Sequence, residues 1–224
     1  MCGRFSLAAN LTIIAQRFGV LSPTAESVAW TPHYNIPPTK TVVVVGDTGT
    51  RYLAQMRWGL IPSWAKDPAI GNRMINARAE TLAVKPAFRV ALRNRRCLVV
   101  ADGFYEWQQR GRGKQPYRIV LKSGEPFGFG GLWDTWTSPE GEAIRTCTIV
   151  TTEANELLRP IHDRMPVILT PEAEGVWLDP RIQEPARLLP LLKPYPAIEM
   201  TTYPVSTRVN NPANDGPECI LPLR

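Results

Sequence analysis

The second residue of the chain can present two reactive groups at once. Cys2 follows Met1, and removal of Met1, which a small second residue generally allows, leaves a thiol and an α-amine on one carbon. Their reference pKa values, about 8.5 and about 8, make a useful fraction of each group nucleophilic at neutral pH. The amine can condense with an aldehyde to an imine, and the thiolate can then close a thiazolidine ring. The alternative is that Cys2 is an ordinary small apolar residue.

A carboxylate lies inside an apolar, aromatic segment. This is Glu106, within Gly103–Trp107. Burial in such a segment would raise the pKa of the carboxyl and suit it to proton transfer near neutral pH. A glutamate at the end of a strand can also face solvent or form a salt bridge, so both interpretations stay open here.

The chain has only two histidines. His162 lies in the segment Ile161–Pro166, a loop entering an apolar strand. It could act as a general acid or base or contact a phosphate, with Asp163 or Arg164 setting its charge. His33 lies in a proline-rich segment and is interpreted as structural.

Aromatic and basic residues are interleaved over about twenty positions. Trp58 and Trp64 bound one segment, and Arg78 follows in the next. Stacking faces beside cations that bind phosphates are what a groove for single-stranded nucleic acid needs. The alternative is that both tryptophans belong to the core.

Positive charge is concentrated in the first half of the chain. Residues 1–112 hold 15 Lys and Arg against 6 Asp and Glu, whereas residues 113–224 hold 11 against 14. A basic half predicts a polyanionic partner, because cations that neutralise phosphates release counterions. A solvated basic face explains the same asymmetry, and charge alone does not decide between them.

Composition and cysteine spacing argue against several classes of protein. With 44% apolar and 21% charged residues, the chain can bury a core. The four cysteines form no C-x-x-C pair, and two histidines do not complete a zinc site, so no metal site is predicted. No apolar stretch approaches roughly 18 residues. We therefore expect reduced cysteines, no membrane association and a cytoplasmic protein, at the nucleoid if the source is bacterial.

Extended segments dominate the predicted secondary structure. A β-branched run at 41–45 and an alternating segment at 51–58 flank turn residues 46–49, which predicts a hairpin. Further strands are expected at 97–101, 104–107, 117–121, 127–132, 145–151, 165–169 and 198–203. Helices are expected at 10–18, 79–84, 153–158, 171–178 and 185–192.

The arrangement of these elements predicts the fold class. Strands outnumber helices and do not alternate with them, which favours an α+β fold with a mainly antiparallel sheet or barrel and short peripheral helices. The 22 prolines and 16 glycines indicate tight turns, and no stretch is typical of a flexible linker. We expect a single domain over residues 1–224.

Five segments carry a specific resemblance. They are M-C-G-R-F from Met1, W-G-L-I-P-S-W-A from Trp58, M-I-N-A-R-A-E-T from Met74, G-F-Y-E-W from Gly103 and I-H-D-R-M-P-V-I-L from Ile161. In this order and at these spacings they resemble the SOS-response-associated peptidase (SRAP) family of abasic-site processing proteins. The similarity runs over essentially the whole chain and implies an SRAP-like fold.

The resemblance also implies a mechanism. Members of this family protect abasic sites in single-stranded DNA by forming a covalent DNA–protein crosslink. Processed Cys2 would capture the ring-opened deoxyribose aldehyde as a stable thiazolidine. Carried over by matching segment, Asn76 would hold the Cys2 terminus and the sugar-derived chain, Glu106 would shuttle protons, and His162 would contact the abasic residue or its phosphate.

DNA contacts follow from the same matching segments. Arg4 and Arg78 would contact the flanking phosphates, and Trp64 and Trp107 would provide apolar or stacking surfaces. The resemblance implies no cofactor and no metal, and we expect a monomer. A nearby cluster of arginines adds positive charge, but we do not assign it a place in the groove. The cluster consists of Arg89, Arg93, Arg95 and Arg96.

Four other activities are weighed against crosslinking. Self-processing, which the family's peptidase label suggests, ranks second, because only Met1 precedes Cys2 and a general aminopeptidase can remove it. A cysteine protease would use Cys2 as nucleophile, His162 as base and Asn76 to orient the base. A non-covalent single-strand binder would keep its DNA association without Cys2. A β-elimination lyase would stop at the imine and cut the strand.

Overall fold

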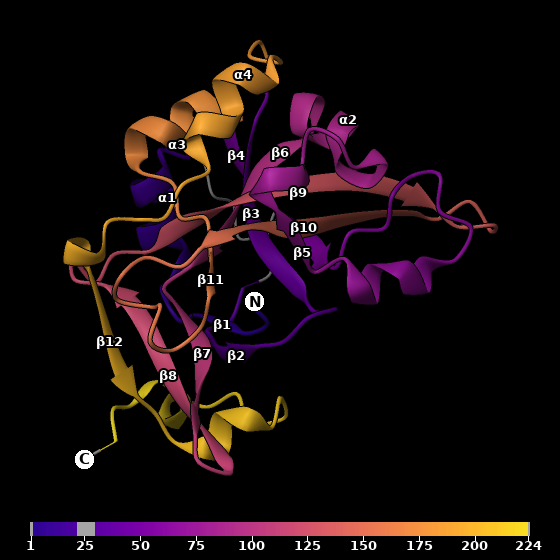
Figure 1. The fold of residues 1–224 in the computed structure, drawn as a ribbon. Coiled ribbons are helices and arrows are strands. Elements are labelled where there is room, and N and C mark those ends of the chain that lie inside the picture. The colour runs from indigo at the N-terminus through magenta and orange to yellow at the C-terminus, as the bar shows by residue number, and fades with distance from the viewer. Residues whose placement is uncertain (1, 22–29, 224) are drawn as a thin grey trace.

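A closed five-stranded barrel forms the centre of the protein (Figure 1). The computed structural model describes residues 2–21 and 30–223. The barrel strands pair in the order β10-β4-β3-β6-β9, and β9 pairs back to β10. Their bounds are β3 (Thr41–Asp47), β4 (Arg51–Trp58), β6 (Arg96–Ala101), β9 (Phe127–Thr137) and β10 (Ala143–Glu153).

Two short strands extend the barrel along β10. β5 (Asn76–Arg78) pairs with the same edge of β10 as β4 does, and it begins just after the pairing with β4 ends. β11 (Arg164–Pro166) pairs with the last residues of β10. The contacts of β4 and β5 with β10 are parallel, whereas the remaining strand pairs of the barrel are antiparallel. The chain between β4 and β5 therefore leaves the barrel and returns to the same edge.

A second, fully antiparallel sheet lies against the barrel, with β7, β8 and β12 below it in Figure 1. Its order is β12-β8-β7-β1-β2. The strands are β1 (Phe5–Leu7), β2 (His33–Ile36), β7 (Gly103–Arg110), β8 (Gly113–Leu121) and β12 (Met200–Pro204). Together the two sheets confirm the predicted fold class, mostly strands in antiparallel pairs with few short helices.

Short helices lie at the periphery, with α1, α3 and α4 gathered at one end of the barrel (Figure 1). Their bounds are α1 (Leu11–Phe18), α2 (Pro86–Asn94), α3 (Pro171–Leu178) and α4 (Pro185–Leu188). Six 3-10 turns are assigned in the described residues: Pro68–Arg73, Ala79–Thr81, Leu189–Leu191, Ala197–Glu199, Thr207–Asn210 and Pro217–Ile220. None of the helices in this part of the chain is long and apolar enough to cross a membrane.

Side-chain caps explain where two of the helices begin. Asn10 accepts a hydrogen bond from the Ile13 amide at the start of α1, and Thr170 accepts one from the Ala173 amide at the start of α3. Helix α1 ends at Gly19, whose φ of 65° is the left-handed conformation that glycine adopts without strain. Both helices match their predicted ranges.

Aromatic contacts join the second sheet to the barrel. The Phe5 ring lies 5.1 Å from Trp58 and 5.8 Å from Phe129 between ring centroids, and Phe104 lies 6.0 Å from Phe129. All four side chains are buried. Strand β1 is therefore fixed against the barrel by packing as well as by its strand pairing.

The predicted helix at 153–158 is wrong. β10 continues to Glu153, and the chain then turns. The Asn155 side chain accepts from the Leu158 amide and donates to the Tyr195 carbonyl oxygen, so it stabilises a turn in place of a helix. The predicted helix at 79–84 contains one 3-10 turn, Ala79–Thr81, and helix α2 was not predicted.

Arg96 has a structural role that the sequence did not reveal. It is 7% exposed, although it belongs to the basic cluster around α2. Its guanidinium donates to backbone carbonyls at the ends of α2 and α3, those of Leu92, Arg93, Trp177, Asp179 and Ile182. These bonds satisfy carbonyls that helix ends leave unpaired, so Arg96 is not available to a ligand.

Candidate active site

Strand β1 places Cys2 beside β7. Phe5 pairs with Phe104, and the Tyr105 amide donates to the Arg4 carbonyl oxygen at 3.0 Å. Because the two strands are antiparallel, residues before Phe5 lie next to residues after Phe104. The register therefore brings Cys2 towards Glu106.

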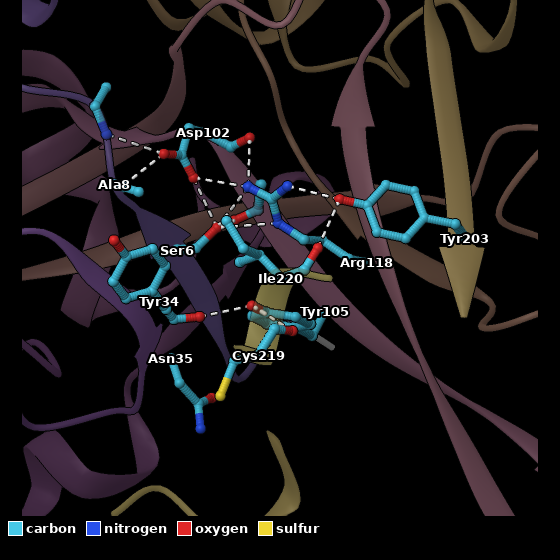
Figure 2. Close-up of polar contacts among 12 residues, drawn as sticks. Ser6, Ala8, Tyr34, Asn35, Asp102, Tyr105, Arg118, Tyr203, Cys219 and Ile220 are labelled. Carbon is cyan, nitrogen blue, oxygen red and sulfur yellow. Dashed lines mark hydrogen bonds and ion pairs between the residues drawn. The ribbon is translucent and has the colours of Figure 1, made fainter. Parts of the chain in front are cut away.

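A buried polar network holds β1 in this register (Figure 2). Asp102 accepts from the Ser6 hydroxyl at 2.7 Å, the Ala8 amide at 2.5 Å and Arg118 Nη2 at 3.0 Å. Arg118 also donates to the Tyr203 hydroxyl at 2.8 Å, which extends the network to β12. Several shared bonds to one partly buried carboxylate fix the backbone of β1.

The Cys2 side chain has no exposed surface. Asn76 Nδ2 donates to the Cys2 carbonyl oxygen at 2.7 Å, and the thiol sulfur lies 4.0 Å from the Arg4 carbonyl oxygen. Burial raises the pKa of the Cys2 thiol far above its usual value, and the Glu106 carboxylate raises it further. The resting thiol is therefore protonated, and sulfur needs a base before it can attack.

Glu106 is the group that could act as this base. It is 3% exposed, so the buried interpretation of this carboxyl is correct. Burial raises the pKa of the Glu106 carboxyl, and His162 acts in the opposite direction. A carboxyl with a raised pKa can both give and take a proton nearer to neutral pH.

Asn76 reaches Cys2 from the other side, because it begins β5 at the edge of β10. It pairs with Ile149 in the parallel register. Its Nδ2 holds the Cys2 carbonyl, whereas its Oδ1 is buried and has no hydrogen-bond partner among residues 2–21 and 30–223. This oxygen is therefore ready to accept a bond from an N–H or O–H donor.

His162 lies in the turn between β10 and β11 and interacts electrostatically with Glu106. Its Nδ1 accepts from the Arg164 amide at 3.0 Å, a bond that favours the tautomer with the ring proton on Nε2. The Asp163 carboxylate lies 2.9 Å from the same Nδ1 and would pair with the imidazolium. Because Asp163 is 88% exposed, that ion pair would be weak.

Of the four predicted DNA-contacting residues, Arg4 and Trp107 pack on each other and on the C-terminal segment. Arg4 Nη1 donates to Asn35 Oδ1 at 2.7 Å and to the Val209 carbonyl oxygen at 2.8 Å. Its guanidinium carbon lies 5.9 Å from the centroid of Trp107, whose Nε1 donates to Asn210. Burial lowers the pKa of Arg4, and Nη1 is engaged in internal contacts.

The other two, Trp64 and Arg78, line a cavity with Asn76. The cavity has a volume of about 380 Å³, and Trp64 is 59% exposed. Two cations that sequence reasoning missed, Arg73 and Lys85, lie in the same wall. Both belong to the basic half of the chain, and only the fold shows that they face this cavity.

The other histidine and the cysteines have structural surroundings. His33 Nδ1 lies 2.6 Å from Asp215 Oδ2 and so joins β2 to the C-terminal segment, which supports its structural interpretation. The four cysteines are buried free thiols. Among the residues that the structure describes, no three His, Cys, Asp or Glu side chains group as metal ligands.

Comparisons with known proteins identify the family and the fold. A family model described as SOS response associated peptidase (SRAP) matches residues 1–212. Abasic site processing protein YoqW of Bacillus subtilis is 48% identical over 98% of this chain and 99% of its own length. Abasic site processing protein HMCES of Gallus gallus is 37% identical over 86% of this chain and 66% of its own. A crystal structure of a Bacteroides thetaiotaomicron protein has a TM-score of 0.90 at 30% identity, covering both chains fully.

We predict that Glu106→Gln stabilises the folded protein at pH 7. The folded-state pKa of this carboxyl is raised, so its contribution to stability is present below the unfolded value, about 4.3, and is lost as pH rises through the folded value. The amide of the Gln variant does not ionise, so the variant does not lose this stability as the pH rises. Urea unfolding across pH should show a variant that is more stable at pH 7 and equal to wild type below about pH 4.

The matched control is Glu140→Gln, in the exposed turn between β9 and β10. It removes the same charge from a solvated site, so its unfolding free energy should stay within about 0.5 kcal/mol of wild type at each pH. Equal stability of wild type and Glu106→Gln at pH 7 would contradict the assignment of a costly buried carboxyl.

Proposed function

The chain belongs to the SOS response associated peptidase (SRAP) family, and from this membership we propose that it captures abasic sites in single-stranded DNA covalently through Cys2. The relatives named above are abasic site processing proteins. The observation that carries the proposal is the buried Cys2, held by Asn76 and close to Glu106. We also propose that residues 1–224 form a single domain that acts as a monomer.

The reaction joins an aminothiol to an aldehyde. Once residue 1, which lies outside the described residues, is removed, the Cys2 amine attacks the aldehyde carbon of the ring-opened sugar. Loss of one water gives an imine. The sulfur then adds to the imine carbon, and the thiol proton ends on nitrogen, which gives a thiazolidine. The balance needs no oxidant, reductant or cofactor.

Glu106 performs the proton transfers in this scheme. As an acid it protonates the hydroxyl that leaves as water, and as a base it accepts the proton of the Cys2 thiol. The second step is needed because the raised thiol pKa keeps sulfur protonated at rest. A carboxyl with a raised pKa suits both steps.

Asn76 and His162 hold the reacting groups. The buried Asn76 Oδ1 can accept from the Cys2 amine while Nδ2 keeps the Cys2 carbonyl in place. With its proton on Nε2, His162 can donate to a hydroxyl of the opened sugar or to a neighbouring phosphate. Orienting the amine towards the carbonyl carbon lowers the entropic cost of reaction.

The DNA strand enters across Trp64. A second cavity of about 480 Å³ shares Trp64, Pro86 and Ala87 with the cavity at Asn76 and is lined by Arg89 and Arg95. Stacking on an exposed tryptophan and contacts with flanking cations bind single strands without reading sequence. An abasic residue has no base to unstack, so reaching its sugar costs less than base flipping.

The thiol environment argues against the protease alternative. Cysteine proteases depend on a thiolate with a depressed pKa, commonly beside a histidinium. Here the pKa of Cys2 is raised by burial and by a carboxylate. Self-processing stays the second candidate activity, because the chemistry requires a free Cys2 amine. Lyase activity would follow if the imine eliminated before sulfur added.

We predict that wild-type protein forms a denaturation-resistant crosslink with a strand that carries one abasic site. Cys2→Ala and a variant with one extra residue before Cys2 should form none, because each lacks half of the aminothiol. Glu106→Gln should crosslink about 100-fold more slowly. Denaturing gels measure the shifted band, with an intact strand as the DNA control.

The matched protein control is Cys219→Ala, which removes a buried thiol in the C-terminal segment and should crosslink like wild type. Cys2→Ser keeps the amine, so strand scission or a band seen only after borohydride reduction would indicate imine formation. Equal crosslinking by wild type and Cys2→Ala would overturn the proposal.

We predict separately that Arg78→Ala and Lys85→Ala weaken non-covalent binding. The ligand is a strand with a tetrahydrofuran site, which has no aldehyde and cannot crosslink. If each cation neutralises one phosphate, each variant should reduce the slope of log affinity against log salt by about 0.7. Trp64→Ala should lose about 1–3 kcal/mol of binding free energy. Fluorescence anisotropy measures both quantities.

Arg181→Ala is the matched control, because Arg181 is 88% exposed, lies beyond α3 and pairs with Asp179. Its affinity and salt slope should equal those of wild type. If Arg78→Ala and Lys85→Ala also left the slope unchanged, the cavity at Asn76 would not be the path of the strand.

A further inference from the structure

An ion pair spans the end of β10 close to the proposed site. Arg164 Nη1 lies 2.6 Å from Glu80 Oε1, and Nη2 lies 3.0 Å from Oε2. Thr151 of β10 pairs with Arg78 of β5 on one side and with Pro166 of β11 on the other. Glu80 follows β5 and Arg164 begins β11, so the pair joins the strands on both sides of β10.

The Arg164 guanidinium is fixed at more than one point. Nη2 also donates to the Thr151 carbonyl oxygen at 2.7 Å. The Arg164 side chain is 15% exposed, whereas that of Glu80 is 52% exposed. The hydrogen bond from Arg164 lowers the pKa of Glu80, so the carboxylate stays charged at neutral pH. Two parallel bonds between guanidinium and carboxylate restrict both position and direction.

The backbone of the same arginine contacts His162. The Arg164 amide donates to His162 Nδ1 at 3.0 Å, which favours the ring proton on Nε2. The competing partner of Nδ1 is the exposed carboxylate of Asp163, 2.9 Å away. The ring also interacts electrostatically with Glu106 of β7. The Arg164 amide and the Asp163 carboxylate therefore compete for Nδ1, and the amide favours the tautomer with the proton on Nε2.

We propose that Glu80 is a positioning residue for His162, acting through the ion pair that fixes Arg164 and its amide. Glu80 is half exposed and its carboxylate pairs with Arg164, so its proposed role is to position His162 and is distinct from catalysis. The inference deepens the proposed function and rests on it for the role of His162.

Anchoring matters because His162 is in a turn. The chain leaves β10 at Glu153 and returns at β11, which has only three residues. Ordered loops depend on a few anchoring contacts. In Glu80→Gln the guanidinium keeps one acceptor, the amide oxygen, and loses the second bond and the charge, so the first residue of β11 becomes less restrained. The Nδ1–H tautomer of His162, donating to Asp163, would then gain population.

The test combines a tautomer measurement with a rate measurement on Glu80→Gln. Long-range proton–nitrogen NMR spectra distinguish Nδ1–H from Nε2–H, and with two histidines in the chain the His33 signal serves as an internal reference. We expect His162 of wild type to be mainly the Nε2–H tautomer and Glu80→Gln to gain the Nδ1–H form. Glu80→Asp, which keeps the charge, should lie between them.

Rates are measured in single turnover at saturating abasic strand, so that changes in DNA affinity do not enter. Glu80→Gln should crosslink about tenfold more slowly than wild type, by analogy with the outer residues that orient a metal-bound histidine. In a His162→Ala background the same substitution should have no further effect, because Glu80 acts only through His162. The charge-matched control, Glu125→Gln in the exposed turn before β9, should behave like wild type.

Each outcome has one meaning. Unchanged His162 tautomers in Glu80→Gln overturn the inference, and so does an unchanged rate despite altered tautomers. An equal slowing in the His162→Ala background also overturns it, because Glu80 would then act by another route. If wild type fails to crosslink while Glu80→Gln still alters the tautomers, the proposed function fails and the structural link to His162 stands.

Discussion

The antiparallel pairing of β1 with β7 is the constraint on which the site depends. It pairs Phe5 with Phe104, fixes the Arg4 carbonyl on the Tyr105 amide and so brings Cys2 near Glu106. A slip of one residue would turn Phe5 out of the core and move the carboxyl away from the thiol. The partly buried carboxylate of Asp102 opposes such a slip, because it binds Ser6 and the amides that follow β1 (Figure 2).

Strand β10 supplies the other half of the arrangement. β5, with Asn76, lies along one edge of β10, and β11 pairs with its last residues just after His162. These are strands of three residues, too short to be stable alone, and they form because β10 provides the partner backbone. The reactive groups therefore sit where two independent sheets meet, and the geometry between them is set by strand register.

The sequence predicted the long elements and selected the residues of the candidate site, but not how the fold brings those residues together. Alternating and β-branched runs predicted the hairpin of β3 and β4, and motif resemblance selected Cys2, Asn76, Glu106 and His162 together. β1, β2 and β5 were missed because segments of three or four residues carry too little periodicity. The wrong helix at 153–158 came from local propensity, which the Asn155 side chain overrides with bonds to distant residues. The burial of Arg96 was also unpredictable, since charge clusters ordinarily face solvent.

The mass of the DNA adduct tests the central claim most directly, namely that the buried aminothiol of Cys2 is the group that reacts. After digestion of the crosslink with protease and nuclease, the account predicts an N-terminal peptide that begins at Cys2 and carries the opened sugar, with the loss of one water. Borohydride treatment should leave this mass unchanged, because a thiazolidine has no imine to reduce. A sugar on any other peptide, or an adduct that survives only after gaining two hydrogens from borohydride, would contradict the account.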